Sequence, residues 1–508
     1  MEFNLIENGI NTLNSCFKQN LEQEIEGEII IPDYYPEISK ILKCRVTPFV
    51  SSKELNGTSL TIEGNAIVSI IYSDEEKRIS CYRYSLNFSK NTDIEKTVEE
   101  PIISVEIGMP KINCKAQSPR KILINGYVNL GVEVKSQTAI SVVNEIEGNS
   151  VCCKKEKIEY TSFDGYFEKN IIIEDEIPLP TTEEAFGSLV RVNMCCNISE
   201  CKGVGEKAVI RGDLIIDGSY TNEASKIKEF RSSHGFSQIM EIGGDIDDST
   251  ACECKPTVVF YDIKPKISAD GTVKCMNMET KILIKLYKNS NRKTEVVTDA
   301  FCVNCDNECH YDSIDYLKMQ NKISERFLCK KNIDFSDGSF TEVYDCWCDV
   351  KETVGRIENG LCTVNGNINI CVLGCDENGT PEYIEKTIDF NYSCETDKNT
   401  NCTAPSCNVK ITAVEYSNHV NGSMEVKAEI LIECSIMAVQ RISYLKGLCA
   451  NAKLESDDDV GLVIYYCNSD ETVWNIAKSY TTSPEDIMAV NNLSEETIKK
   501  CQPLVIPL

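Results

Sequence analysis

Long apolar runs, histidine and positive charge are all scarce in this sequence, and each scarcity excludes a class of protein. No uninterrupted apolar stretch reaches the ~18 residues of a membrane-spanning helix, and the first residues show no basic segment followed by an apolar one. We therefore expect neither a transmembrane segment nor an export signal, and a cytoplasmic location. The formal net charge is −27, which argues against nucleic acid and anionic lipid as direct partners and leaves a protein with a basic face.

Catalytic motifs are also missing. A Ser–His–Asp or Cys–His site would have to use His234, His310 or His419, and none of them lies in a nucleophile motif. The glycines Gly203 and Gly205 lack the rest of a dinucleotide fingerprint or a phosphate loop. The sequence predicts a protein that is not an enzyme and that needs no cofactor.

Cysteine, in contrast, is abundant, with 28 residues. Without an export signal, reduced thiols that pack as small apolar side chains are a simpler interpretation than a disulfide framework. One group has the spacing of metal ligands: Cys302, Cys305, Cys309 and His310. Four soft ligands could form a tetrahedral zinc site. However, no second Cys-x-x-Cys follows, and an adjacent Cys-His pair rarely supplies two ligands to one ion, so we expect thiols and no metal.

A strand pattern recurs three times along the chain. Segments that alternate between apolar and polar residues surround Gly64, Gly212 and Gly366, which are 148 and 154 residues apart. A second alternating segment follows each of them in step, around Val128, Ile282 and Ile430. A unit of about 150 residues is long enough for a core of its own. Short alternating segments separated by Asn-Gly and Asp-Gly turns favour antiparallel sandwiches or barrels.

The predicted fold is mainly β, with three tandem antiparallel β-rich units and a small C-terminal βααβ module. The expected order is an N-terminal helical segment (1–25), unit one (26–155), unit two (156–312), a helical connector (313–322), unit three (323–454), an acidic linker (455–459) and the C-terminal module (460–508).

The C-terminal module is the most clearly patterned part of the chain. A β-prone segment at 463–467 precedes a helical pattern at 472–480, a second helix that Ser483 and Pro484 can start, and a short closing strand at 504–506. This order and the residues of segments 470–477, 490–493 and 499–507 resemble the LysM family.

The LysM resemblance implies a ligand site between the first loop and the last. Its residues here are Asp470, Glu471, Thr472, Trp474, Lys499 and Lys500. Most of the matching residues, Trp474 among them, are also ordinary core residues. The family binds N-acetylglucosamine polymers mainly through backbone contacts, but Asp470 and Cys501 replace its loop glycines. Since glycine permits positive φ and a close approach of backbone to ligand, this change argues against a sugar.

Unit one resembles the SPOCS domain of spore-forming bacteria. The resemblance rests on segment 29–42, with Pro32 and Pro36, and on segment 114–121, which contains Ser118-Pro-Arg-Lys121. Unit two keeps only 177–180 of this pattern, and unit three keeps only the strands. The residues Arg120 and Lys121 either contact a partner or end a solvated strand.

SPOCS-type units followed by one LysM module are similar to the SipL-like family of spore-coat morphogenetic proteins. This resemblance implies a mother-cell adaptor that binds the coat-basement ATPase SpoIVA through its LysM module at the forespore surface. The alternative that the LysM resemblance alone implies is a peptidoglycan-binding protein of the cell wall or the spore cortex.

Overall fold

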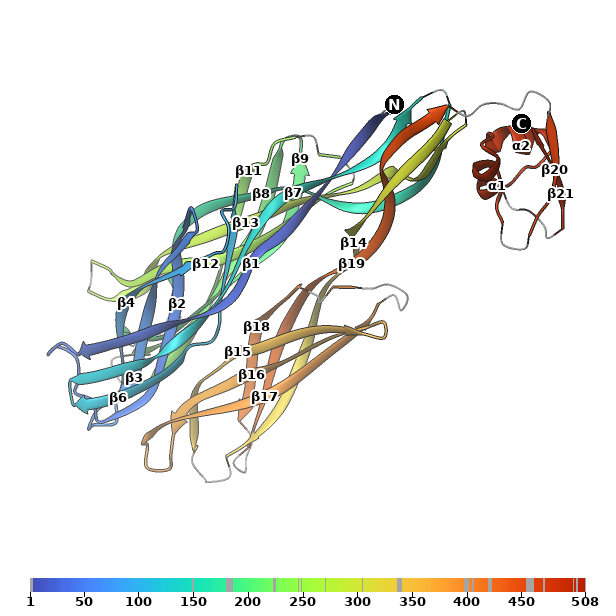
Figure 1. Ribbon diagram of the computed structural model, residues 1–508. Helices are drawn as coiled ribbons and strands as arrows, with labels where there is room; N and C mark the ends of the chain where they lie inside the picture. Colours follow the sequence, from blue (N-terminus) through green and yellow to red (C-terminus); the bar gives the residue numbers. More distant parts are fainter. Residues whose placement is uncertain are drawn as a thin grey trace.

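A computed structural model describes the fold of most of the chain. The residues described are 3–148, 150–179, 186–222, 225–244, 246–247, 249–269, 271–303, 305–335, 340–396, 402–403, 406–418, 423–453, 461–468, 471–496, 498 and 501–507. Antiparallel strands dominate, and two short helices lie near the C-terminus, which confirms the predicted fold class (Figure 1).

Three sandwiches with one strand order make up most of the molecule. Each begins with a long strand and continues through a three-stranded meander. One or two shorter strands then lead to a second long strand. The first comprises β1 (Asn4–Ile30), β2 (Lys40–Asn56), β3 (Ser59–Ser73), β4 (Ile79–Asp93), β5 (Ile102–Ile107), β6 (Lys111–Ser118) and β7 (Lys121–Glu147). The second comprises β8 (Val151–Pro178), β9 (Phe186–Val204), β10 (Lys207–Asn222), β11 (Ile227–Glu241), β12 (Thr250–Ile267) and β13 (Val273–Cys302). The third comprises β14 (Cys305–Asp334), β15 (Glu342–Glu358), β16 (Leu361–Cys375), β17 (Pro381–Glu395), β18 (Ser406–Asn418) and β19 (Ser423–Lys453).

Each sandwich consists of two facing antiparallel sheets. In the first, the meander sheet has the order β2-β3-β4, and the other sheet has β7 between β1 and the pair β5 and β6. The second and third sandwiches repeat this with β9-β10-β11 against β12-β13-β8, and β15-β16-β17 against β14-β19-β18. Alternate residues of the central strands point inward, and those of β3, such as Ile62 and Val68, are fully buried. The repeated sequence pattern is therefore the core of a repeated sandwich.

The three repeat glycines lie beneath phenylalanine rings. The paired residues are Gly64 and Phe88, Gly212 and Phe236, and Gly366 and Phe390. A Cβ atom at Gly212 would lie 2.3 Å from the carbonyl oxygen of Asn197 and 2.8 Å from the Phe236 ring. No side chain fits there, so an aromatic residue on the neighbouring strand fills the space that glycine leaves.

The two segments that resemble the SPOCS domain touch each other. The Nη1 of Arg120 donates hydrogen bonds to the carbonyl oxygens of Pro32 (3.0 Å) and Tyr35 (3.1 Å), and its Nε donates to Glu37 (3.0 Å). The backbone N–H of Ile31 donates to the carbonyl of Arg120 at 2.8 Å. Arg120 therefore fastens the proline-rich turn after β1 to the start of β7 and has a structural role.

The long strands form three ribbons, β1 with β7, β8 with β13, and β14 with β19. Beyond the sandwiches the ribbons pack against one another and form a stalk, which runs to the upper right in Figure 1. Its core contains Ile10, Val142, Ile158, Tyr160, Val296, Ile314, Tyr316, Ile442 and Tyr444. The strand β7 continues into β8 at the stalk tip, as β13 does into β14, so one chain builds all three ribbons.

Two segments that we predicted to be helical are strands. Most of the predicted N-terminal helix (1–25) lies in β1, and the predicted connector (313–322) lies within β14. Their backbone groups pair with β7 and with β19, more than 100 residues away in sequence, which replaces the local hydrogen bonds of a helix. The predicted acidic linker (455–459) lies outside the described residues.

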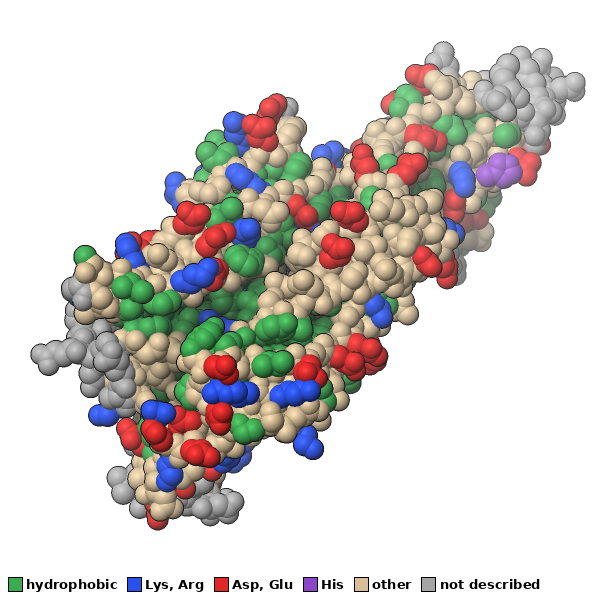
Figure 2. Space-filling view, turned by 90° about the vertical axis from the view of Figure 1, so that its left-hand side faces the viewer, with side chains coloured by type: hydrophobic (Ala, Val, Ile, Leu, Met, Phe, Trp, Pro, Cys, Tyr) green, Lys and Arg blue, Asp and Glu red, His purple; other side chains and the backbone are tan. Residues whose placement is uncertain are grey.

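A buried ion pair joins the second and third sandwiches. The carboxylate of Asp345 accepts hydrogen bonds from Nε (2.8 Å) and Nη2 (3.0 Å) of Arg191 and from the hydroxyl of Ser219 (2.6 Å). The side chain of Asp345 is fully buried and that of Arg191 is 5 % exposed. On the molecular surface, acidic and basic side chains are interspersed over the face shown in Figure 2.

Candidate partner-binding site

The C-terminal module has the predicted strand–helix–helix–strand order. Its elements are β20 (Leu462–Tyr466), α1 (Val473–Tyr480), α2 (Pro484–Val490) and β21 (Pro503–Pro507), and the two strands pair antiparallel. Thr472 caps α1 by accepting a hydrogen bond from the Asn475 N–H, and Ser483 caps α2 by accepting one from the Asp486 N–H, both at 3.3 Å. Thr472, a predicted binding residue, therefore starts a helix.

The predicted binding residue Glu471 closes the first loop on itself. Its carboxylate accepts hydrogen bonds from the backbone N–H of Asn468 (2.9 Å), the hydroxyl of Tyr465 (2.7 Å) and the Asn468 amide (3.1 Å). The same hydrogen bonds, with the Asn468 backbone first, hold the pKa of Glu471 below its usual value. The carboxylate of Glu471 is thus already hydrogen-bonded within the module.

The last loop keeps a left-handed backbone without glycine. Cys501 has φ = 62°, and its N–H donates to the carbonyl oxygen of Cys467 at 2.9 Å. We expected the loss of glycine to restrict positive φ here, but the hydrogen bond to Cys467 holds a conformation that costs a non-glycine residue roughly 1–2 kcal/mol. Cys501 therefore keeps a positive φ without glycine, and its thiol is exposed.

Trp474 lies at the contact between the module and the stalk. Its indole Nε1–H donates to Asp299 of β13 at 2.8 Å, and the Lys478 ammonium donates to the same carboxylate at 2.6 Å. The ring of Phe301 meets the indole edge to face, with centroids 5.1 Å apart. Phe301 is 2 % exposed and Trp474 is 5 % exposed, so the two rings close one apolar core between stalk and module.

Asp299 is the centre of this contact. Besides its two partners in α1, it accepts a hydrogen bond from the hydroxyl of Tyr311 on β14 at 2.6 Å. Burial alone would raise the pKa of Asp299, but the hydrogen bonds, that from Lys478 first, outweigh it and hold the pKa below its usual value. The carboxylate therefore stays charged at neutral pH and holds α1 on the stalk.

The outer face of β20 is apolar and exposed. Leu462, Ile464 and Tyr466 alternate along the strand and are 59 %, 60 % and 67 % exposed. Their neighbours Val463 and Tyr465 point to the other side and pack in the core of the module. In Figure 1, α1 lies on the side of the module nearer the stalk, and β20 and β21 lie on the far side. The module therefore presents an apolar strip away from the rest of the chain.

The sequence-based site is only partly described by the structure. Asp470, Lys499 and Lys500 lie outside the described residues. Glu471, Thr472 and Trp474 are close together, but each already has a partner within this chain. Sequence reasoning missed the strip on β20, although the alternation of Leu462, Ile464 and Tyr466 with inward-facing residues was a readable signal.

The candidate metal ligands do not form one site. Cys302 and Cys305 form a disulfide at the stalk tip, so the expectation of reduced thiols is wrong for these two. Cys302 is the last residue of β13 and Cys305 is the first residue of β14. Cys309 and His310 are successive residues of β14 and point to opposite faces. Among the described residues, no group of three or more His, Cys, Asp and Glu side chains is arranged to hold a metal ion.

One group of side chains has the contacts of a hydrolase triad. The Nε2 of His234 lies 2.9 Å from the hydroxyl of Ser232, and its Nδ1 lies 2.7 Å from the carboxylate of Asp175. A hydrolase also needs a substrate cavity and donors for the oxyanion. Ser232 lines none of the three prominent grooves found in the described part of the chain. We assign His234 to packing, because it links β11 to β8 at the edge of the second sandwich.

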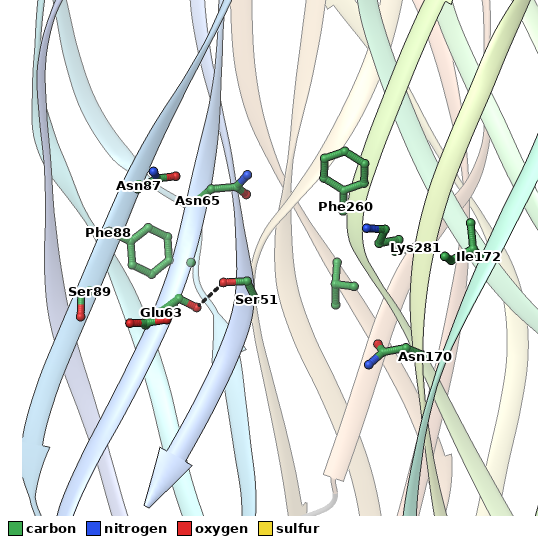
Figure 3. Close-up of a pocket in the computed structure, with 12 residues that line it drawn as sticks. Ser51, Glu63, Asn65, Asn87, Phe88, Ser89, Asn170, Ile172, Phe260 and Lys281 are labelled. Atoms are coloured by element: carbon green, nitrogen blue, oxygen red, sulfur yellow. Dashed lines mark hydrogen bonds between the residues drawn. The ribbon is translucent and has the colours of Figure 1, made fainter.

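An open groove of about 920 Å³ lies between the first two sandwiches. Figure 3 shows the amides of Asn65 and Asn87 on one wall and Asn170 and Phe260 on the other. The Lys281 ammonium lies 5.1 Å from the centre of the Phe260 ring. The lining also includes the Phe88 ring, the Glu63 carboxylate and the hydroxyls of Ser51 and Ser89, so the groove can bind a polar ligand.

Comparison with known proteins agrees with both resemblances. Residues 37–117 match the model of the SipL SPOCS domain, and residues 468–507 match the LysM domain. The chain therefore carries a SPOCS domain in its first sandwich and a LysM domain at its C-terminal end, in the order found in SipL-like proteins. No curated protein and no solved structure shows significant similarity to the chain. No helix in the described residues is long and apolar enough to cross a membrane.

Proposed function

We propose that this protein is a non-enzymatic adaptor in spore-coat morphogenesis that acts in the mother cell. Its LysM domain binds the coat-basement ATPase SpoIVA and thereby recruits the chain to the forespore surface. The matches to a SipL SPOCS domain and to a LysM domain support the sporulation role. The proposed docking is based on the exposed apolar strip on β20.

The strip suits a protein partner better than a sugar. Leu462, Ile464 and Tyr466 offer two aliphatic side chains and one aromatic side chain on one exposed face, a composition typical of the centre of a protein interface. In contrast, the Glu471 carboxylate of the first loop is bonded within the module to Asn468 and Tyr465. The net charge of −27 favours a basic surface on the partner.

A pair of matched variants tests this proposal. Ile464→Ser removes an apolar side chain from the strip, and Val490→Ser removes one that is 50 % exposed on α2 in the same domain. Burial of an isoleucine contributes about 1.5–3 kcal/mol, so Ile464→Ser should weaken SpoIVA binding roughly 10- to 100-fold, with Val490→Ser close to wild type. Equal binding by wild type and Ile464→Ser would contradict the role of the strip.

Point variants are preferable to removal of the whole domain. Truncation of residues 460–508 should abolish binding of SpoIVA, but it would also uncover Phe301 at the stalk tip, which is buried in the complete chain. Aggregation of the truncated protein could then imitate a loss of function. Circular dichroism and gel filtration of each variant are therefore required controls.

Glycan binding is the alternative function, and one observation favours it. Cys501 has the positive φ that a glycine at this position would readily adopt. Retention of the wild-type chain on purified peptidoglycan measures glycan binding directly. Saturable retention that Ile464→Ser leaves unchanged would favour a cell-wall or cortex role over docking to SpoIVA.

A further inference from the structure

Four cysteines gather in the core of the third sandwich. Cys407 on β18 and Cys434 on β19 are directly paired across neighbouring strands, and Cys362 on β16 and Cys394 on β17 are paired in the same way in the facing sheet. All four belong to one apolar cluster. The sulfur atoms of Cys407 and Cys434 are 2.7 Å apart, with the Cys434 thiol donating to the Cys407 sulfur.

This geometry is already close to that of a disulfide. Directly paired residues of antiparallel strands have Cα atoms about 4.5–5.5 Å apart, and disulfides require about 4.4–6.8 Å. The sulfur atoms of Cys407 and Cys434 are also well inside the van der Waals distance of two thiols. Bond formation between Cys407 and Cys434 therefore needs no rearrangement of β18 or β19.

We propose that Cys407 and Cys434 form an intramolecular disulfide site that closes by exchange with a low-molecular-weight disulfide. The Cys407 thiolate attacks one sulfur of the small disulfide, which releases the first small thiolate and leaves a mixed disulfide on Cys407. The Cys434 sulfur then attacks the Cys407 sulfur and releases the second small thiolate. Two electrons pass from the cysteine pair to the small disulfide, and the two cysteine protons end on the two small thiols.

The surroundings assign a separate role to each cysteine. Cys407 is half-buried and so can be reached by a small disulfide, whereas Cys434 is 3 % exposed. The hydrogen bond from Cys434 favours the thiolate of Cys407 and lowers its pKa. Cys407 is therefore the attacking thiol, and Cys434 is the thiol that resolves the mixed disulfide.

Thiol contacts also occur in the other two sandwiches. Hydrogen bonds link Cys44 of β2 to Cys114 of β6, and Cys201 of β9 to Cys252 of β12. Each joins the first meander strand to the strand that returns along the facing sheet. Paired thiols are thus a feature of all three sandwiches, and Cys407 and Cys434 are directly paired with their sulfur atoms 2.7 Å apart.

The experiment treats the full-length reduced chain with oxidised glutathione, blocks the remaining thiols under denaturing conditions, and identifies the cysteine pairs by peptide mass spectrometry. Apart from the Cys302–Cys305 disulfide, a peptide linked through Cys407 and Cys434 should form first. In Cys434→Ala, Cys407 should accumulate as the mixed disulfide with glutathione, and in Cys407→Ala, Cys434 should remain unmodified. Cys329→Ala, which changes a cysteine on β14 outside the four-thiol group, should leave the 407–434 link intact.

Three outcomes would overturn the proposal. The first is that both thiols remain free in the wild-type chain after the exposed Cys16 and Cys501 have been oxidised. The second is a link from Cys407 to Cys402 or Cys394 in place of Cys434. The third is a stoichiometric zinc ion in the purified chain that is lost when the four cysteines are alkylated, which would make this group a metal site. The wild-type measurements decide the question even if a variant fails to fold.

Discussion

Removal of the Asp299 carboxylate should release the LysM domain from the stalk. In the structure this carboxylate accepts hydrogen bonds from Trp474 at 2.8 Å and from Lys478 at 2.6 Å, both in α1. The bond from the buried indole to a charged acceptor contributes about 1.5–3 kcal/mol, and that from the partly exposed Lys478 contributes at most about 1 kcal/mol after solvent screening. Asp299→Ala should therefore weaken docking by about 2–4 kcal/mol, which lowers the ratio of docked to released domain roughly 30- to 1,000-fold.

Tryptophan fluorescence can follow the release. The chain has two tryptophans, and Trp347 is buried at the junction of the sandwiches, away from the stalk tip. A red shift in emission should therefore report Trp474 as it leaves Phe301 and Asp299. Limited proteolysis should also cut the segment between β19 and β20 faster in Asp299→Ala than in wild type.

Graded and control variants sharpen this measurement. Asp299→Asn keeps one acceptor oxygen without the charge, so its effect should lie between those of wild type and Asp299→Ala. Asp312→Ala removes a carboxylate of β14 that pairs with Lys446 on the exposed surface, and it should leave the emission unchanged. If Asp299→Ala and Asp312→Ala both keep the wild-type emission and proteolysis rate, the carboxylate does not hold the domain.

Acid should produce the same release. The docked state lowers the pKa of Asp299, so docking favours the ionised form and weakens as the pH falls through the docked-state pKa. We therefore expect unchanged emission between about pH 8 and pH 5, and a red shift only below about pH 4. A red shift centred near pH 6 would show that another group controls the contact.

Two further predictions concern stability, measured as the midpoint of unfolding in urea. Gly212→Ala should destabilise the chain by about 3 kcal/mol, because the added Cβ would overlap the Phe236 ring. Gly9→Ala should be near neutral, since the nearest atom to its added Cβ is 3.9 Å away. Equal unfolding midpoints for the two variants would refute the overlap at Gly212. Asp345→Ala should cost about 3–5 kcal/mol, because it leaves the buried Arg191 without its bidentate partner, and an unchanged midpoint would show that water or Asp217 replaces it.

The sequence was sufficient for the sandwiches because their strands alternate strictly. In β3, Ile62, Ala66 and Val68 all lie on the inward face, and the same pattern recurs around Gly212 and Gly366. The N-terminal strand β1 does not show this strict alternation of buried residues. Its buried residues Leu21, Ile25 and Ile29 are four apart, since Gln23 and Gly27 occupy the inward positions between them, and a spacing of four also suits a helix.

The candidate site could be predicted only where its signals are local. The caps Thr472 and Ser483 stand beside the helices that they start, so their positions follow from the sequence. The contact between Asp299 and Trp474 joins residues 175 positions apart, and neither residue has a neighbour that indicates the other. Trp474 was identified as a core or a binding residue, and the structure shows that the core to which it belongs is shared with the stalk.

The position of the LysM domain follows from how the three ribbons are joined. Because β7 continues into β8 and β13 into β14 at the stalk tip, the last long strand, β19, also ends there, and the domain that follows it is delivered to the tip. A linker alone would let this domain turn freely. The contacts of Trp474 and Lys478 with Asp299 fix α1 against the stalk and so turn the strip of Leu462, Ile464 and Tyr466 outward. Under the proposed function, the stalk therefore sets the direction in which the domain meets its partner. If this is correct, Asp299→Ala should reduce the affinity for SpoIVA even though it changes no residue of the strip.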